Sequence, residues 1–228
     1  MKQKIGKILM ALGALLILAS IALLAYNRWD ADRAAKASQD ALQKLEETLV
    51  NEADSEPEAP PPELDPEQEM TEVEIDGWNY IGYLSIPAVK LNLPVMSQWS
   101  YAGLKVAPGR YSGSTYADNM VVCAHNYAKH FSPIKWLAIG SQVSFTDMDG
   151  LCWEYEVVSV ETVQPTQIEK MITVTDENDW DLTLFTCTTG GNARCAVRCV
   201  RTGYPTVAQV EQAEDPADSG ASSAQQES

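Results

Sequence analysis

The 228-residue sequence contains only two histidines, His125 and His130, and five cysteines. No Cys-x-x-Cys or His-x₃-His spacing occurs, so a metal site built from these ligands is not expected. An odd number of cysteines cannot all pair within one chain. We predict that Cys195 and Cys199 pack as small apolar side chains. A disulfide between two of the other cysteines is compatible with the sequence.

Basic residues are also missing from two long stretches. Residues 51–76 contain eleven acidic residues, five prolines and no Lys or Arg, and residues 206–228 contain five acidic residues and again no Lys or Arg. These stretches account for the net charge of −16, while residues 77–205 are nearly balanced and carry no basic stripe typical of nucleic-acid binding. We therefore predict an acidic Pro-rich linker at 51–76, one folded domain at 77–205 and a disordered acidic tail at 206–228.

Charge is absent from residues 8–26 as well, a run of nineteen residues that follows three lysines. Nineteen helical residues rise about 28 Å, which is close to the hydrocarbon thickness of a bilayer. The run is longer than the apolar part of a typical cleaved signal peptide and lacks an Ala-x-Ala site at its end. We predict an uncleaved signal-anchor over residues 1–28, with basic residues on both sides that nearly balance and so do not fix its orientation.

Apolar residues recur at helical spacing in residues 29–50, which predicts a juxtamembrane helix. A stalk, a helix lying on the membrane and weak self-association are all compatible with this pattern. No second hydrophobic run follows residue 204, so a single membrane crossing is expected.

The predicted domain is rich in short strand-like segments, among them residues 106–111, 141–146 and 153–158. Residues 147–150, Asp-Met-Asp-Gly, form a strong hairpin signal between the last two. Many short strands at regular intervals favour an all-β fold with a closed or nearly closed barrel.

Cys187 ends the apolar run 182–187, and a short Gly-containing loop separates it from the strand-like residues 194–198. Pairing of the two segments as a hairpin would place Arg194 opposite Cys187. A guanidinium there would stabilise a thiolate and could donate hydrogen bonds to an oxyanion. Arg198 is the alternative, but it lies about 13 Å further along the strand, so only one of the two arginines can reach the sulfur.

A cysteine nucleophile needs an imidazole that exchanges protons with the substrate and the leaving group. His125 directly follows the strand-like residues 119–124, and functional groups often lie where a strand meets a loop. We therefore favour His125 as this partner, and we expect His130 to be a surface or hydrogen-bonded structural residue.

Residues 183–187, Thr-Leu-Phe-Thr-Cys, resemble the Thr-Leu-x-Thr-Cys signature of sortases, the cysteine transpeptidases of Gram-positive cell surfaces. Residues 119–126 resemble the sortase histidine strand, and residues 81–87 and 93–95 resemble further sortase blocks. The resemblance covers roughly residues 77–204. It implies an eight-stranded β-barrel in which Cys187 is the nucleophile, His125 the acid/base and Arg194 the stabilising cation.

The resemblance also implies a single-pass membrane protein with an extracellular catalytic domain. Such an enzyme would cleave a C-terminal sorting motif of secreted proteins through a Cys187 thioester and transfer the acyl group to a cell-wall or pilin amine. No cofactor is called for, although some sortases use calcium and the acidic loops leave that question open.

Two other hypotheses for the function remain. The chain could be a membrane-anchored cysteine peptidase that only hydrolyses its substrate, or a noncatalytic surface β-domain. Within the sortase reading, pilus assembly is disfavoured because Asp65-Pro66 is followed by Glu67 rather than by the Trp or Phe of a lid motif. A C-terminal membrane span is not evident either, so protein anchoring is favoured.

Overall fold

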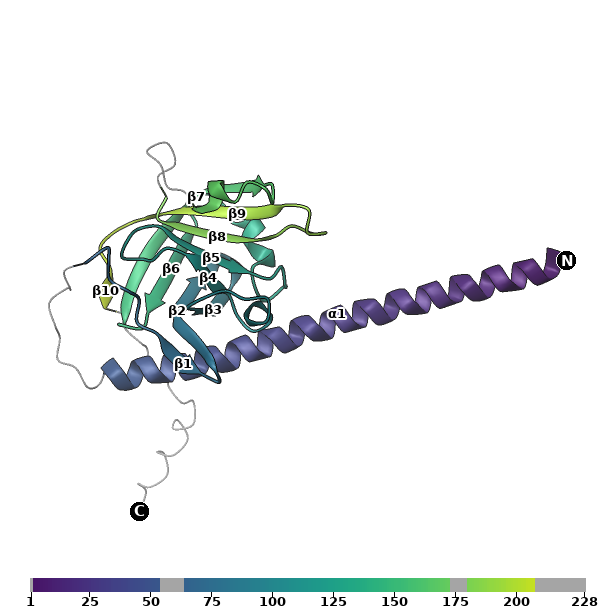
Figure 1. Cartoon of the computed structure of the whole chain (residues 1–228), viewed down its shortest axis with the longest axis horizontal. Helices are drawn as coiled ribbons and strands as arrows, with labels where there is room; N and C mark the ends of the chain where they lie inside the picture. The colour runs from purple at the N-terminus through teal and green to yellow at the C-terminus, as the bar shows by residue number, and fades with distance from the viewer. Residues whose placement is uncertain (1, 54–63, 173–179, 208–228) are drawn as a thin grey trace, which may run out of the picture.

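The computed structural model describes residues 2–53, 64–172 and 180–207. The tail predicted at 206–228 lies outside these residues except for its first two, and residues 54–63 of the predicted linker also lie outside them. Beyond the long first helix the described chain is mostly β-structure (Figure 1).

Eight strands form a closed barrel, which confirms the predicted fold. In barrel order each strand pairs with the next, from β2 through β3, β4, β5, β8, β9 and β7 to β6, and β6 pairs with β2 to close the ring. The pairs β3–β4 and β5–β8 are parallel, and the others are antiparallel. The strands are β2 (Trp78–Ile86), β3 (Leu91–Met96), β4 (Gly109–Ser112), β5 (Met120–Ala124), β6 (Gln142–Asp147), β7 (Leu151–Val163), β8 (Leu182–Cys187) and β9 (Arg194–Arg201).

Short elements complete the fold. Strand β1 (Val73–Ile75) pairs with β2, and β10 (Thr206–Val207) pairs with β7. One-turn helices lie in the connections, namely η1 (Pro87–Val89), η2 (Gly103–Lys105), η3 (Ser132–Trp136) and α2 (Glu169–Ile172).

The barrel closes at Gly82, where β2 pairs with β3 on one side and with β6 on the other. Gly82 has a φ of 145°, and a Cβ atom at this position would collide with the backbone carbonyl of Thr146. Only glycine therefore allows β2 and β6 to approach this closely. The interior is filled by apolar side chains such as Ile81, Leu84 and Trp153, which are fully buried.

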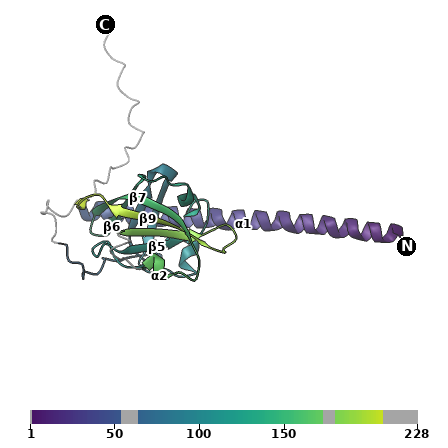
Figure 2. The same ribbon diagram turned by 90° about the horizontal axis from the view of Figure 1, so that it is seen from above.

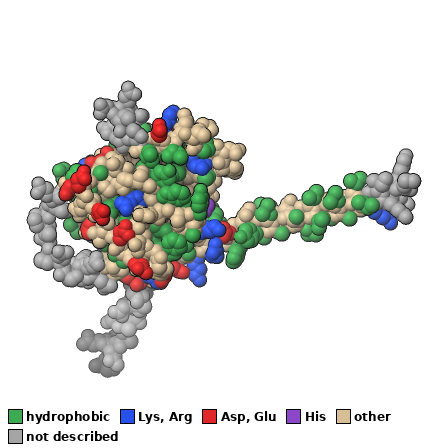
Figure 3. Space-filling model, in the orientation of Figure 1, with side chains coloured by type: hydrophobic (Ala, Val, Ile, Leu, Met, Phe, Trp, Pro, Cys, Tyr) green, Lys and Arg blue, Asp and Glu red, His purple; other side chains and the backbone are tan. Residues whose placement is uncertain are grey.

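Helix α1 (Lys2–Ala53) runs without a break through both the predicted signal-anchor and the predicted juxtamembrane helix. Its N-terminal half projects away from the barrel, and its C-terminal half lies alongside it (Figures 1 and 2). The large apolar side chains of residues 8–26 are all exposed, as the green surface of the projecting helix shows (Figure 3). Among the described residues α1 is the one helix long and apolar enough to cross a membrane, and so much exposed apolar surface fits a lipid environment.

The second half of α1 is packed against the barrel. Leu45 is fully buried in an apolar cluster, and Lys44 forms an ion pair with Asp76 at 2.6 Å. The cluster consists of Ala41, Leu45, Leu49, Ile75, Tyr80, Met96, Ala107 and Met148. The periodic apolar residues of the predicted juxtamembrane helix thus face a partner within the same chain.

Residues 64–76, the last part of the predicted linker, lie against the domain. Met70 is buried in the main core and Ile75 in the cluster beneath α1. These two apolar side chains hold residues 64–76 against the domain. The acidic and Pro-rich composition of residues 51–76 as a whole did not predict this packing.

Replacement of Leu45 by Ala should lower the free energy of unfolding by about 2–5 kcal/mol, because it empties a buried site between α1 and the barrel. The measurement is chemical denaturation of a chain that begins at residue 29, since residues 1–28 are not expected to be needed for folding. Gln43→Ala, at an exposed position of the same helix, should change the value by less than about 0.5 kcal/mol. Equal stability of the two variants would show that the helix does not pack as described.

Candidate active site

Cys187 is the last residue of β8, and Arg194 is the first residue of β9. The antiparallel register pairs them directly, as Cys187 opposite Arg194. The connecting loop is closed by a hydrogen bond from the Thr188 N–H to the Ala193 carbonyl at 2.9 Å. The predicted hairpin is therefore present, and its geometry puts a cation and a thiol side by side.

His125 reaches the same place from a different strand. The parallel register of β5 and β8 pairs Ala124 with Thr186, and the Thr186 hydroxyl donates a hydrogen bond to the Ala124 carbonyl at 2.8 Å. His125 and Cys187 each follow these residues directly, so they leave adjacent strands at the same level. Side chains alternate along a strand, so this register predicts both residues on the face that Cys123 and Phe185 share in the apolar cluster outside the main core.

Arg194 is oriented by the loop. Its Nη1 group donates to the Gly191 carbonyl at 3.2 Å and to the Ala193 carbonyl at 3.1 Å. These contacts hold the guanidinium near the hairpin turn, on the strand position opposite Cys187. Because a guanidinium carries five N–H donors, contacts through one nitrogen leave it able to donate to a further anion.

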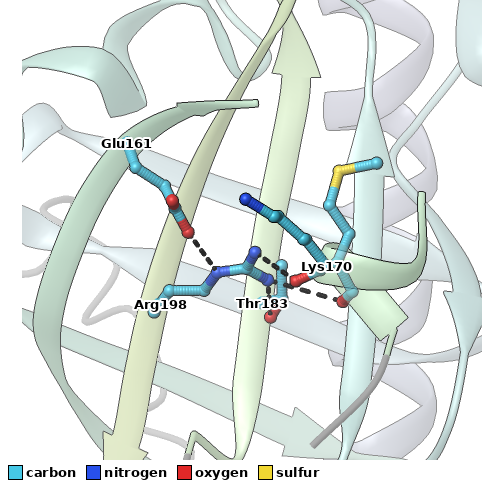
Figure 4. Close-up of polar contacts among 5 residues, drawn as sticks. Glu161, Lys170, Thr183 and Arg198 are labelled. Atoms are coloured by element: carbon cyan, nitrogen blue, oxygen red, sulfur yellow. Dashed lines mark hydrogen bonds and ion pairs between the residues drawn. The ribbon is translucent and has the colours of Figure 1, made fainter. Parts of the chain in front are cut away.

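Arg198, the alternative to Arg194, pairs in register with Thr183 and is only 1% exposed. Its guanidinium donates to Glu161 at 3.0 Å and to the Thr183 hydroxyl at 2.8 Å, and it lies 4.2 Å from the ring centroid of Trp180. Further hydrogen bonds go to the backbone carbonyls of Lys170, at 2.6 Å, and Met171, at 3.4 Å (Figure 4). Through these contacts Arg198 links β9 to β7, β8 and α2, and its role is structural. The spacing of residues along the strand did not predict this role.

The surroundings of His125 favour its neutral form. Burial lowers the pKa of His125, and the positive charge of Lys105 lowers it further, while the carboxylate of Asp30 raises it. The ring of Tyr127 lies against the imidazole, with 4.8 Å between the ring centroids.

His130, which we expected to be a surface or hydrogen-bonded structural residue, is fully buried, so the expectation of a surface position was wrong. Its ring meets the Tyr127 ring edge-on at 5.5 Å, and burial lowers the pKa of His130 to about 4. Burial therefore favours the neutral imidazole at this position near pH 7.

All five cysteines are free thiols. Burial raises the pKa of Cys123 and of Cys199 to about 12 and also raises the pKa of Cys152 and Cys195. Cys123 donates a weak hydrogen bond to the Gly109 carbonyl at 3.5 Å. Burial thus disfavours the thiolate at each of these four positions, whereas Cys187 is half-exposed at a strand end.

A cleft of about 380 Å³ opens beside Cys187. It is lined by residues from β7, β8, β9 and the two loops around the site, among them Asn126, Lys135, Glu161, Cys187, Thr188 and Thr189. Within the described residues, no three His, Cys, Asp or Glu side chains gather in a way that could hold a metal ion.

The comparisons with known proteins agree with this architecture. The sequence model of the family described as "Sortase domain" matches residues 84–202. Among solved structures, sortase C of Streptococcus pneumoniae is 22% identical with a TM-score of 0.51, and the likeness covers 77% of this chain and 95% of that one. Sortase C-3 of the same organism is 21% identical with a TM-score of 0.50, over 77% and 92% of the two chains.

Sortase C1 of Streptococcus suis is 28% identical over 55% of this chain and 74% of its own, with a TM-score of 0.47. The two S. pneumoniae likenesses support the fold. The comparison with curated proteins gave no match.

Arg198→Ala should lower the free energy of unfolding by about 3 kcal/mol, because it leaves the buried Thr183 hydroxyl and the buried Met171 carbonyl without this donor. Arg194→Ala, on the same strand but half-exposed, should cost less than about 1 kcal/mol. Denaturant titration of both variants checks this difference. A larger loss at Arg194 than at Arg198 would contradict the assignment of Arg198 to the structural framework.

Proposed function

The chain belongs to the sortase family, and from this premise we propose that it is a membrane-anchored cysteine transpeptidase. It would cleave a sorting motif near the C-terminus of a secreted protein and join the new end to an amine of the cell wall or of a pilin. The observation that supports the proposal is the register of three strands, in which Cys187 pairs with Arg194, and the residues just before His125 and Cys187 pair with each other.

In the proposed first step, the Cys187 thiolate attacks the carbonyl carbon of the scissile peptide bond. The bond to nitrogen then breaks, the His125 imidazolium gives its proton to the leaving amine, and a thioester remains on Cys187. Arg194 stabilises the negative charge that develops on the carbonyl oxygen. Its loop contacts support this role, because they hold the guanidinium at the hairpin turn that follows Cys187.

In the second step, the acceptor amine attacks the thioester carbon and loses a proton to His125, and the Cys187 thiolate leaves. The cleft beside Cys187 offers room for one of the two substrates. Each step balances with the side chains alone, so the proposed reaction calls for no cofactor. The hydrolase alternative differs only in that water replaces the amine.

The membrane anchor supports the same proposal. The apolar part of α1 ends at residue 26, and α1 continues as one helix to the cluster beneath the barrel. The catalytic domain would thus be held close to the bilayer, on the extracellular side that the sortase reading implies. The lack of a lid motif after Asp65-Pro66 still favours protein anchoring over pilus assembly.

Cys187→Ala should abolish cleavage of a sorting peptide, and His125→Ala should reduce it nearly as far, because a nucleophile and its proton partner act as one unit. The measurement is peptide cleavage by the full chain in detergent, screened against a peptide library with several amine acceptors. Lys129→Ala, an exposed position in the loop that follows His125, should retain full activity. Activity that survives in Cys187→Ala would refute the proposal.

Arg194→Ala should slow acylation by about 10²-fold, which is the usual effect of removing one donor to an oxyanion. Arg194→Lys should recover only part of the rate, because an ammonium keeps the charge but loses the planar fork of donors. Single-turnover kinetics of thioester formation measures both. A rate within twofold of wild type in Arg194→Ala would remove Arg194 from the proposed site.

A further inference from the structure

Helix α1 contacts the proposed active site at the point where it meets the barrel. Asp30 lies four residues beyond the end of the apolar run. The Tyr127 hydroxyl donates a hydrogen bond to its Oδ2 atom at 2.6 Å. Figure 1 shows the helix leaving the barrel toward its N-terminus, so this contact joins the anchor to the catalytic domain.

The contact continues to the imidazole. The rings of Tyr127 and His125 lie 4.8 Å apart between centroids, with 34° between their planes. On the helix side, Arg33 holds Asp30 through an ion pair of 2.9 Å. A continuous set of contacts therefore runs from α1 through the Tyr127 ring to His125.

The backbone around His125 is held by hydrogen bonds within its own loop. The His125 carbonyl accepts a hydrogen bond from the Phe131 N–H at 3.2 Å, and the Tyr127 carbonyl accepts from the N–H groups of His130 and Ser132, each at 3.1 Å. These bonds set the path of the loop but do not restrain the Tyr127 side chain. The hydrogen bond to Asp30 supplies that restraint.

We infer that Asp30 is a positioning residue, which holds the Tyr127 ring against His125 and so fixes the orientation of the imidazole in front of Cys187. The membrane anchor would then be a working part of the active site. This inference rests on the proposed function, in which His125 exchanges protons with both substrates.

The charges around His125 agree with such a coupling. The charged groups that act on it are Asp30 on α1 and Lys105 on η2, and the rings of Tyr127 and His130 lie near it in its own loop. The carboxylate of Asp30 raises the pKa of His125 and opposes both burial and Lys105, which lower it. Loss of the Asp30 charge should therefore move the titration of His125 to lower pH.

The test uses the full chain in detergent micelles and compares Asp30→Ala, Tyr127→Phe, the double variant and Asp30→Asn. Asp32→Asn, an exposed position on the same helix, is the matched control. Asp30→Ala and Tyr127→Phe should each lower kcat about tenfold with little change in KM, since small displacements of a reacting group slow chemistry strongly. The double variant should lose no more than the larger single loss. Asp30→Asn keeps an acceptor and should recover part of kcat.

The second readout is the titration of the His125 imidazole, which is measured by NMR of histidine-labelled protein. The chain has only two histidines, and burial lowers the pKa of His130 to about 4. Asp30→Ala and Asp30→Asn should both move the His125 midpoint to lower pH, and Asp32→Asn should not.

An unmoved His125 titration in Asp30→Ala would overturn the inference, even if kcat fell, because the loss would then be merely structural. Additive losses in the double variant would overturn it as well. If the wild-type chain forms no thioester, the proposed function fails, and the His125 titration alone then decides whether α1 acts on the imidazole.

Discussion

The pairing of β5, β8 and β9 is the constraint on which the proposed site depends. The parallel pair aligns Ala124 with Thr186, and the antiparallel pair aligns Cys187 with Arg194. A shift of one residue in either pair would turn a side chain to the barrel interior. The hydrogen bond from Thr186 to the Ala124 carbonyl and the buried framework around Arg198 both oppose such a shift. Arg198 is thus important for the site without lying in it.

The proposed site also depends on helix α1, which packs against the barrel as well as carrying the apolar segment. Its apolar N-terminal half is exposed, one face of its C-terminal half is buried against the barrel, and the boundary between them lies at Asp30 beside Tyr127. A continuous helix transmits position along its length, so the orientation of the barrel relative to a bilayer would follow from the packing of α1 on the barrel. The end of the barrel that carries His125 would accordingly face the membrane.

Much of this could be predicted from the sequence, because the signals are local. A β-barrel was predicted from the alternation of side chains along short strands and from the turn at Gly150. The hairpin after Cys187 predicted that Arg194 lies opposite Cys187. The role of Arg198 could not be predicted, since its partners Glu161 and Thr183 come from two other strands. The packing of α1 was missed for a similar reason. Small apolar residues at helical spacing do not show whether their partner is lipid, another chain or the barrel.

The most direct test of the proposed transpeptidase is the intact mass of the full chain during turnover of a sorting peptide. The account predicts an acyl adduct on Cys187 that is absent in Cys187→Ala and that an added amine releases faster than water does. An adduct whose release no amine accelerates would identify a hydrolase instead. The absence of any adduct on Cys187, with cleavage still observed, would contradict the account.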